Sequence, residues 1–377
     1  MEGEARPMCR AFLVQIMQYE ADLMSLGSER DRLDDVRIAE TRPLISPAIL
    51  LEEIARTPES SAKVLAARRT VAEIAFGEDK RLVAIVGPCS IHDPAAAREY
   101  AERITRMADR YRDHIFIVMR TYFEKPRTVI GWEGFITDPD LNGSHRINRG
   151  LREARGLLRD LAEMGLPTAT EFLDMTVPQY ISDFLTWGAI GARTSESQPH
   201  RQLASGLSMT VGFKNPVDGR IQPAVDAILS AQRSHWFPSI TKDGVAAHFR
   251  TTGNQHTHLV LRGGSKSGPN FEASHIEEAA AVLAKAGLPQ RVMVDCSHAN
   301  SHKDHTRQGG VALEIADQLR NGSRHVFGIM LESNLVAGRQ DIDPMRELVY
   351  GQSVTDACID LEETDRLLDA LATAVAH

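Results

Sequence analysis

The sequence predicts an α/β fold, and specifically a closed (β/α)8 barrel of the TIM-barrel type. From Arg81 onward, short apolar runs typical of buried strands alternate with longer amphipathic stretches typical of helices. Eight such runs fall within about 270 residues, which fits a barrel of eight parallel strands. Polar or charged side chains directly follow these runs, as they do where a barrel carries an active site.

Each predicted strand is a short run of mainly apolar or β-branched residues. The eight runs are Leu82 to Val86, Phe116 to Met119, Thr168 to Thr170, Ala189 to Ala192, Val211 to Phe213, Leu259 to Leu261, Val292 to Val294 and Val326 to Met330. Amphipathic stretches such as Ala95 to Tyr111 and Gly150 to Met164 lie between most of them and are predicted to be helices. This alternation requires a parallel sheet with helices on its outer side.

The chain before the barrel is predicted to be a helical extension. We assign residues 1–80 to this extension, with a role in regulation or oligomerisation, and residues 81–377 to the catalytic barrel. Residues 10–26 have the apolar spacing of an amphipathic helix. Two further helices are predicted to begin at Ser46-Pro47 and Thr57-Pro58, because a capping residue followed by proline is typical of a helix start.

One segment interrupts the alternation of strands and helices. Residues 232–255 contain Lys242-Asp243-Gly244 between apolar flanks, and an Asp-Gly pair in this setting indicates a hairpin turn. We therefore expect a β-hairpin inserted between two barrel strands. No low-complexity segment or interdomain linker is evident in the sequence.

Composition and charge exclude several classes of protein. The chain has 377 residues, of which 42% are hydrophobic and 25% charged, as in an ordinary globular protein. The formal net charge is -8 without a dominant basic stripe, which argues against non-specific nucleic-acid binding. No apolar run reaches the roughly 18 to 20 residues needed to span a bilayer, and the acidic N-terminus does not resemble a signal peptide. We expect a cytoplasmic protein without nucleic-acid or membrane partners.

Positively charged side chains follow the predicted strands where the strands end. They are Arg120, Lys125, Arg127, Arg193, Lys214 and Arg262. Because the carboxyl ends of barrel strands meet at one mouth, these groups are expected to converge. Arginine suits bidentate capture of phosphate and carboxylate, and lysine acts as a point charge or proton donor. The pattern favours a ligand with several negative charges, the alternative being that these cations form structural ion pairs.

A second set of polar side chains at the strand ends could hold one divalent metal ion. The stretch Arg291 to Ser301 passes from an apolar run into a polar cluster that contains His298. Together with His298, the candidate ligands are Cys89, Glu332 and Asp356. Mixed sulfur, nitrogen and oxygen ligands suit Mn²⁺, Fe²⁺, Co²⁺ or Zn²⁺. No local CxxC or HExxH spacing supports the site, and His298 could instead be a histidine that only packs at a strand end.

The sequence resembles the class I 3-deoxy-D-arabino-heptulosonate 7-phosphate (DAHP) synthases across residues 34 to 376. The resemblance lies in a series of blocks that occur in this order: GPCSIHDP, MRTYFEKPRT, ARTSESQ, GFKN, LRGG, VDCSHANS, LESN and SVTDACI. It implies a metal-dependent transferase that condenses phosphoenolpyruvate with erythrose 4-phosphate and releases phosphate, the first step of the shikimate pathway. It also implies the metal ligands Cys89, His298, Glu332 and Asp356.

The resemblance implies a role for each cation. Arg193 and Arg262 would hold the phosphate of phosphoenolpyruvate, Arg120 its carboxylate, and Lys214 would reach both groups. The KPRT segment is the part most specific to the four-carbon sugar. In it, Lys125 would contact the sugar oxygens, and Arg127 and Thr128 would bind the sugar phosphate. The catalytic residues would be Lys125 and Lys214, together with Glu171 as a group that positions water.

In related enzymes the N-terminal arm and the inserted hairpin form a pocket for an inhibitory aromatic amino acid. The matching positions are Asp35, Pro178, Leu203, Leu207, Ser208, Phe237 and Ser239. The sequence does not identify the effector, and these residues could instead pack an oligomer interface. We expect a homodimer or homotetramer.

Three other functions stay open at this point. The sister enzymes that make 3-deoxy-octulosonate 8-phosphate resemble this chain but look like KANR where it has KPRT. An aldolase that forms a Schiff base could use Lys214 on the same barrel. A barrel that only binds phosphorylated metabolites would be expected to lack at least one of the ligands or arginines.

Overall fold

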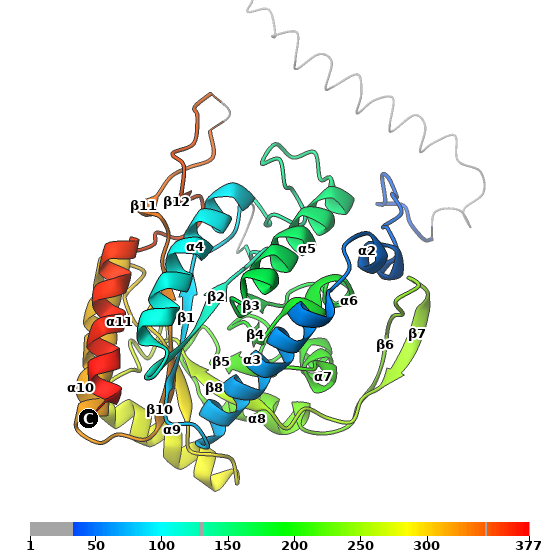
Figure 1. Ribbon diagram of the computed structural model, residues 1–377. Helices are drawn as coiled ribbons and strands as arrows, with labels where there is room; N and C mark the ends of the chain where they lie inside the picture. The colour runs from blue at the N-terminus through cyan, green and yellow to red at the C-terminus, as the bar shows by residue number, and fades with distance from the viewer. Residues whose placement is uncertain (1–32, 128–130, 344, 377) are drawn as a thin grey trace, which may run out of the picture. The chain divides into compact units, whose positions relative to one another are not determined.

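Eight parallel strands form a closed barrel in the computed structural model, which describes residues 33–127, 131–343 and 345–376. The barrel strands are β1 (Leu82–Gly87), β2 (Ile115–Arg120), β3 (Thr168–Glu171), β4 (Trp187–Ile190), β5 (Thr210–Lys214), β8 (Thr257–Leu261), β9 (Val292–Asp295) and β10 (Val326–Glu332). Each strand pairs with the next in this series, and β10 pairs with β1 to close the barrel (Figure 1). The predicted (β/α)8 barrel is confirmed.

All eight predicted runs lie in or overlap a barrel strand. The predicted and observed bounds differ most at β4. We predicted a strand from Ala189 to Ala192, whereas β4 begins at Trp187 and ends at Ile190. The strand ends early because the carbonyl oxygen of Gly191 accepts two turn hydrogen bonds, both 3.0 Å long, from the backbone N–H groups of residues 194 and 195. Arg193 therefore lies in a turn after the strand.

The strands are mainly apolar because both of their faces are buried. In β1, the side chains of Val83 and Ile85 belong to the cluster that fills the barrel, and those of Ala84 and Val86 belong to the larger cluster around it. This arrangement is expected for a parallel sheet covered by helices. The interior is therefore packed, and ligands have access only at its ends.

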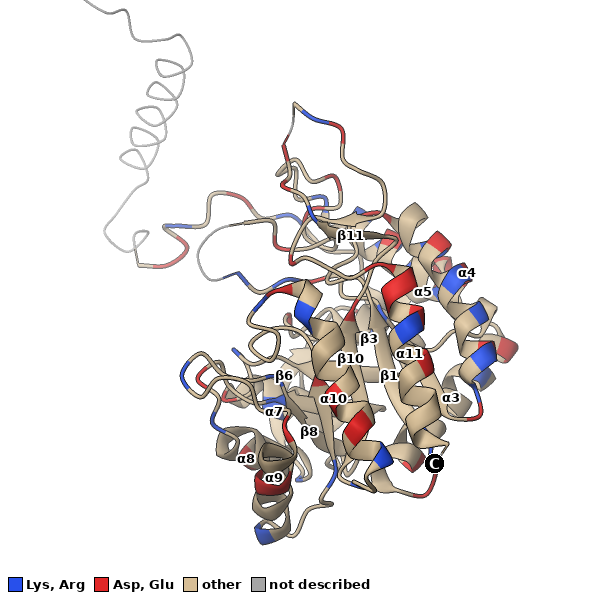
Figure 2. Cartoon of the chain, turned by 90° about the vertical axis from the view of Figure 1, so that its left-hand side faces the viewer, with Lys and Arg blue, Asp and Glu red and all other residues tan. Residues whose placement is uncertain are grey.

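Helices alternate with the strands on the outside of the barrel (Figure 1). They are α4 (Pro94–Tyr111), α5 (Ile147–Met164), α6 (Pro178–Ile181), α7 (Gln198–Gly206), α8 (Gln222–Ala231), α9 (Ala273–Lys285), α10 (Gln308–Arg320) and α11 (Leu361–Val375), with the 3₁₀ helices η2 (Ser182–Phe184) and η3 (His305–Arg307). Acidic and basic residues both occur along α4, α10 and α11 (Figure 2). Among the described helices, none is long and apolar enough to cross a membrane.

Two helices precede the barrel, as predicted. The helix α2 (Pro47–Glu53) begins after Ser46, whose side chain accepts a hydrogen bond from the N–H of residue 49. The helix α3 (Pro58–Phe76) begins after Thr57 with a capping box and ends at Gly77, which has a φ of 89°. The last turns of α3 add Val71, Ile74 and Ala75 to the interior cluster, so this helix covers the end of the barrel from which the strands start.

The chain divides into two compact units, Met1–Leu44 and Ile45–His377. Within the first unit the structure describes residues 33–44. The helices α2 and α3 belong to the second unit with the barrel, whereas we assigned residues 1–80 to one extension. That division stays a prediction. The helix predicted over residues 10–26 lies outside the described residues.

The predicted hairpin is confirmed. The strands β6 (Trp236–Ile240) and β7 (Ala246–Arg250) pair antiparallel. The turn between them contains Gly244 with a φ of 80°, a conformation that glycine adopts without strain. The backbone N–H of Ala48 donates a 2.6 Å hydrogen bond to the carbonyl of Lys242, so the turn contacts the start of α2. A smaller pair of strands, β11 (Val336–Arg339) and β12 (Gln352–Ser353), follows β10.

The barrel interior contains one histidine that is held uncharged. The side chain of His258 is buried, and its Nε2 accepts a 2.9 Å hydrogen bond from the indole N–H of Trp187. The ring also packs edge-on against Phe327, with 4.7 Å between centroids. A Cβ atom on Gly212 would collide with both Trp187 and His258, so glycine leaves the space for this pair. Burial lowers the pKa of His258 to about 4.

We predict that His258 makes the barrel sensitive to acid. In the unfolded chain a histidine has a pKa near 6.5, so the unfolded state binds the proton more tightly than the folded state. The free energy of unfolding is therefore unaffected by this group above pH 6.5, and it decreases by roughly 3 kcal/mol as the pH falls towards 4. His258→Gln should therefore show a smaller loss of unfolding free energy over this window, measured by urea denaturation. The exposed His248→Gln serves as control, and parallel pH profiles for wild type and His258→Gln would contradict the assignment.

Candidate active site

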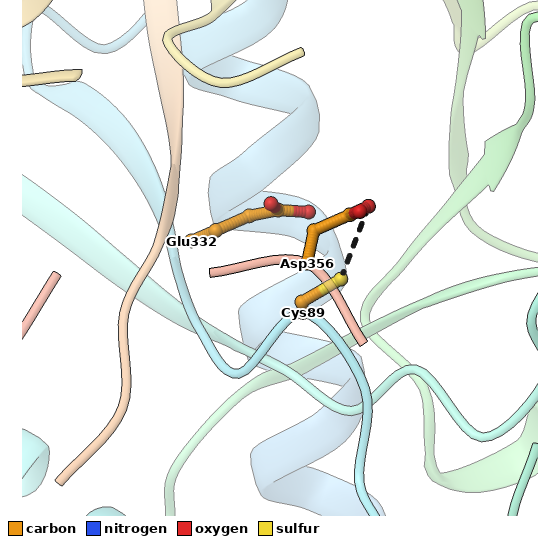
Figure 3. A group of neighbouring side chains, drawn as sticks. All are labelled: Cys89, Glu332 and Asp356. Carbon is orange, nitrogen blue, oxygen red and sulfur yellow. Dashed lines mark hydrogen bonds between the residues drawn. The ribbon is translucent and has the colours of Figure 1, made fainter. Parts of the chain in front are cut away.

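Three of the four predicted metal ligands lie together at the carboxyl ends of the strands. The Cys89 sulfur and one carboxylate oxygen each of Glu332 and Asp356 lie within 4.8 Å of one another (Figure 3). Cys89 and Glu332 come together because β1 and β10 are neighbours, with Gly87 directly opposite Glu332. Asp356 follows β12, and its Oδ2 lies 3.7 Å from the Cys89 sulfur.

The fourth predicted ligand is His298, and its ring nitrogens do not lie within 4.8 Å of all three of these ligand atoms. Its Nδ1 atom lies 2.9 Å from Asp295 Oδ2 and 2.7 Å from the hydroxyl of Ser297. The backbone of His298 has a φ of 59°, which is uncommon for a residue with a side chain. The structure thus holds the imidazole by one nitrogen. Burial acts to raise the pKa of the Asp356 carboxyl, but the charges of Lys125 and, to a smaller extent, His298 lower it.

The Cys89 thiol is buried and lies near both negative and positive charges. Burial and the charge of Glu332 raise the pKa of the thiol to about 11. The ammonium group of Lys125 lies 3.1 Å from the sulfur and opposes this shift. Lys125 also donates a 3.2 Å hydrogen bond to the carbonyl oxygen of Cys89, so it joins the loop after β2 to the end of β1.

Arg120 is fully buried at the end of β2. Its guanidinium donates a 3.1 Å hydrogen bond to Glu332 and stacks over the ring of Tyr122, with 3.9 Å from Cζ to the centroid. A second donor reaches the carbonyl oxygen of Pro88 at 3.3 Å. A buried charge needs such partners, because an unpaired one is costly to desolvate.

Lys214, at the end of β5, is held by a buried acid. Its Nζ lies 2.9 Å from Oδ2 of Asp295 at the end of β9, and both side chains are almost completely enclosed. Asp295 also accepts hydrogen bonds from Ser297 and His298. Burial alone would raise the pKa of Asp295, but the charges of His298 and Lys214 hold it well below its usual range.

The arginines that follow β4 and β8 are close enough for their charges to interact. Arg262 is 7% exposed, and its Nε has no partner among the described residues. Burial lowers the pKa of Arg262, and the like charge of Arg193 adds to this effect. Arg193 itself is exposed. A buried guanidinium with a free donor, next to a second arginine, is suited to bind an anion.

The remaining predicted site residues occupy β3 and the loop after β2. Glu171 ends β3 and is 8% exposed, and its carboxylate packs directly against Gly191, where a Cβ atom would collide with it. Arg127 is exposed and donates a 2.9 Å hydrogen bond to the carbonyl of Trp132. Thr128 lies outside the described residues.

Two buried acids at the site were given no role in the sequence analysis. Asp295 follows the apolar run of β9 directly, which is a signal that could have identified it. Glu124 precedes the KPRT segment and accepts a hydrogen bond of 3.0 Å from the N–H of Asp174. Burial raises the pKa of Glu124 to about 8. The Glu124 carboxylate joins the loop after β2 to the loop after β3. No local sequence pattern indicates this contact.

The predicted effector residues occupy neighbouring elements of the second unit, except for Asp35, which lies in the first unit. Pro178 begins α6, Leu203 lies in α7, Leu207 and Ser208 follow it, and Phe237 and Ser239 lie in β6. Three of them are buried: Pro178, Leu203 and Phe237. The ammonium of Lys242, in the hairpin turn, donates a hydrogen bond to the carbonyl of Gln179 and so joins the hairpin to α6.

Comparisons with known proteins identify the family. A model of the DAHP synthetase I family matches residues 56–369. The "Phospho-2-dehydro-3-deoxyheptonate aldolase, Trp-sensitive" of Enterobacter agglomerans is 50% identical over 347 residues, which cover 92% of this chain and 99% of the relative. The Phe-sensitive aldolase of Escherichia coli (strain K12) is 50% identical over 342 residues, covering 91% of this chain and 97% of the relative.

A solved structure agrees with this result. The phospho-2-dehydro-3-deoxyheptonate aldolase from Francisella tularensis SCHU S4 is 53% identical, with a TM-score of 0.88, and the match covers 90% of this chain and 98% of that one. Both the predicted fold and the predicted family are confirmed. The chain therefore belongs to the DAHP synthetase I family and is an enzyme with the DAHP synthase activity that gives the family its name.

Proposed function

We propose that this enzyme condenses phosphoenolpyruvate with erythrose 4-phosphate and water to give DAHP and phosphate, using a divalent ion held by Cys89, His298, Glu332 and Asp356. The observation that carries the proposal is that a group of sulfur and oxygen donors lies among buried cations at the mouth of the barrel. The buried cations Arg120, Lys214 and Arg262 lie at the ends of three different strands, β2, β5 and β8. The mouth therefore offers a metal site and an anion site side by side.

The donor set fits one divalent first-row ion. The thiol and the two carboxylates lie within 4.8 Å of one another, a separation that ligands of a single ion can share. Sulfur, nitrogen and oxygen donors together suit Mn²⁺, Fe²⁺, Co²⁺ or Zn²⁺. When bound, such an ion would supply Lewis-acid polarisation of an aldehyde oxygen. Because the donors do not distinguish among these four ions, the proposal extends to all of them.

Three buried cations and the exposed Arg193 bind phosphoenolpyruvate in this proposal. Arg262 and Arg193 hold its phosphate, Arg120 its carboxylate, and Lys214 reaches both. The free Nε of Arg262 and the burial of Arg120 and Lys214 support this assignment. Buried donors that are already positioned stabilise an anion more strongly than solvated ones, because they need no reorganisation.

The second substrate binds beside the first. Lys125 contacts the oxygens of erythrose 4-phosphate, and Arg127 with Thr128 binds its phosphate. Carbon 3 of phosphoenolpyruvate then attacks the aldehyde carbon, forming the new carbon–carbon bond, while the aldehyde oxygen gains a proton. Water adds at carbon 2 and releases a proton, which gives a hemiketal phosphate. Its carbon–oxygen bond to phosphate then breaks while the hydroxyl proton passes to the departing phosphate, and the ketone remains. Glu171 and Lys214 position this water.

Two rival activities are less well supported. Lys214 forms a buried ion pair with Asp295 at 2.9 Å, and an ammonium group has no lone pair for the attack that begins a Schiff base. The octulosonate synthase would use arabinose 5-phosphate, but this chain has the KPRT segment at residues 125–128. The sequence also contains every ligand and cation that the resemblance implies for catalysis, which disfavours a protein that only binds metabolites.

The substrate and metal assignments are tested together. We predict that phosphoenolpyruvate is consumed with erythrose 4-phosphate, that EDTA abolishes this consumption, and that added Mn²⁺ restores it, because the ligands would no longer hold an ion in EDTA. Ultraviolet absorbance of phosphoenolpyruvate reports the rate. Arabinose 5-phosphate is the control, and consumption with that sugar alone would contradict the reading of the KPRT segment. Reductive trapping by borohydride in EDTA would instead support the Schiff-base route.

The position of Glu171 gives a second prediction. Gly191→Ala should lower kcat by about tenfold or more, since the new Cβ atom would collide with the Glu171 carboxylate and displace the group that positions water. Gly156→Ala is the matched control, because a Cβ atom there has no neighbour within 4 Å and the site lies in helix α5. Steady-state kinetics at saturating substrate would measure the difference. Equal kcat values for the two variants would argue against a role for Glu171.

We also propose that an aromatic amino acid inhibits the enzyme through the cluster formed by Pro178, Leu203, Leu207, Ser208, Phe237 and Ser239. The role expected for Asp35 stays a prediction. Two relatives are named as Trp-sensitive and Phe-sensitive enzymes. In this chain, the buried ring of Phe237 packs 6.2 Å from that of Phe249 between ring centroids. Apolar surface next to the polar Ser208 and Ser239 suits a ligand that is both aromatic and charged.

This regulatory site has its own test. Phenylalanine, tyrosine and tryptophan are each added to the assay, and we predict that at least one inhibits. Phe237→Ala should raise its inhibition constant by about tenfold, because a buried aromatic contact is lost. Trp236→Ala is the matched control, because Trp236 precedes Phe237 directly and its side chain is 61% exposed. An unchanged rate with all three amino acids would contradict the proposal.

A further inference from the structure

One carboxylate contacts both halves of the proposed active site. Asp295 is completely buried at the end of β9, and four donors surround it. Oδ1 accepts hydrogen bonds from the backbone N–H and the hydroxyl of Ser297, at 3.0 and 2.6 Å. Oδ2 lies 2.9 Å from Lys214 Nζ and 2.9 Å from His298 Nδ1. Both oxygens are therefore fully used within the protein, which leaves neither of them for a ligand.

The contact with His298 determines which ring nitrogen is available. A carboxylate accepts but does not donate, so Nδ1 carries the proton that it shares with Asp295. Nε2 then has the free lone pair that a metal ion requires. Histidine ligands are commonly oriented in this way by a carboxylate on the other nitrogen. The left-handed backbone of His298 is consistent with a side chain whose direction is fixed by its surroundings.

The contact with Lys214 fixes the second half of the site. Lys214 is only 3% exposed, and a lysine this enclosed needs an anionic partner to stay charged. The Asp295 carboxylate supplies this partner from β9, two strands along from β5 in the barrel. The ammonium group is thereby held at the mouth, where the proposed function requires it to contact phosphoenolpyruvate.

From this geometry we propose that Asp295 is a positioning residue that serves the metal site through His298 and the phosphoenolpyruvate site through Lys214. The inference rests on the proposed function of those two residues. A purely structural role for Asp295 would predict lower stability without specific loss of either ligand. The two roles can therefore be separated by measuring each ligand alone, without turnover.

The experiment compares three single test variants of the full chain with one single control variant. Binding of Mn²⁺ is measured by electron paramagnetic resonance without substrate, and binding of phosphoenolpyruvate by calorimetry in EDTA. His298→Gln should weaken Mn²⁺ only, and Lys214→Met should weaken phosphoenolpyruvate only. Asp295→Asn should raise both dissociation constants by about tenfold or more, since outer partners of metal ligands typically contribute 10- to 100-fold. Asp304→Asn, at a partly exposed acid after the same strand, should change neither.

A fourth variant covers the case in which Asp295→Asn does not fold because it leaves Lys214 unpaired. The double variant Asp295→Asn with Lys214→Met removes both charges, and it should weaken Mn²⁺ more than Lys214→Met does. The proposal would be overturned if folded Asp295→Asn bound only one of Mn²⁺ and phosphoenolpyruvate more weakly, or neither of them. Tighter phosphoenolpyruvate binding would also overturn it, because Asp295 would then compete with the substrate for Lys214. If wild-type protein binds neither Mn²⁺ nor phosphoenolpyruvate, the proposed function itself fails.

Discussion

The hydrogen bonds between β1 and β10 are the constraint on which the rest of the site depends. They close the barrel and place Gly87 opposite Glu332, in a register that continues back to Val83 and Gly328. Two segments from opposite ends of the chain thus meet, and Cys89 and Glu332 lie in one donor cluster. Since apolar side chains fill the interior and α3 covers the far end, the carboxyl ends of the strands are the place where such a cluster can reach a ligand.

Much of this arrangement could be predicted from the sequence, for a physical reason. A strand buried on both faces must be apolar along its length, so Val292 to Val294 stands out from its polar neighbours without any knowledge of the fold. The first polar residue after each run is then a candidate for the mouth. The turn signals at Lys242-Asp243-Gly244 and at Thr57-Pro58 are equally local, because they depend on the backbone preferences of glycine and proline.

What the sequence could not indicate are contacts between segments that lie far apart in the chain. Asp295 is one acid among many until β9 and β5 are brought close enough for its carboxylate to meet Lys214. Glu124 likewise gains its role only when the loop after β3 presents the N–H of Asp174. The end of β4 was placed too late for a related reason, since the hydrogen bonds that draw Gly191 into a turn depend on backbone geometry and leave no mark in the hydrophobic pattern.

The charged groups of the site form pairs that join its two halves. Among the predicted ligands, Cys89 accepts a hydrogen bond from Lys125, Glu332 from Arg120, and His298 shares Asp295 with Lys214. Each of these cations belongs to the proposed substrate site. A divalent ion among the ligands would add positive charge directly beside them, and an anionic substrate would then be attracted by both. A change at a charged partner that the two sites share, such as Asp295, is therefore expected to alter both of them.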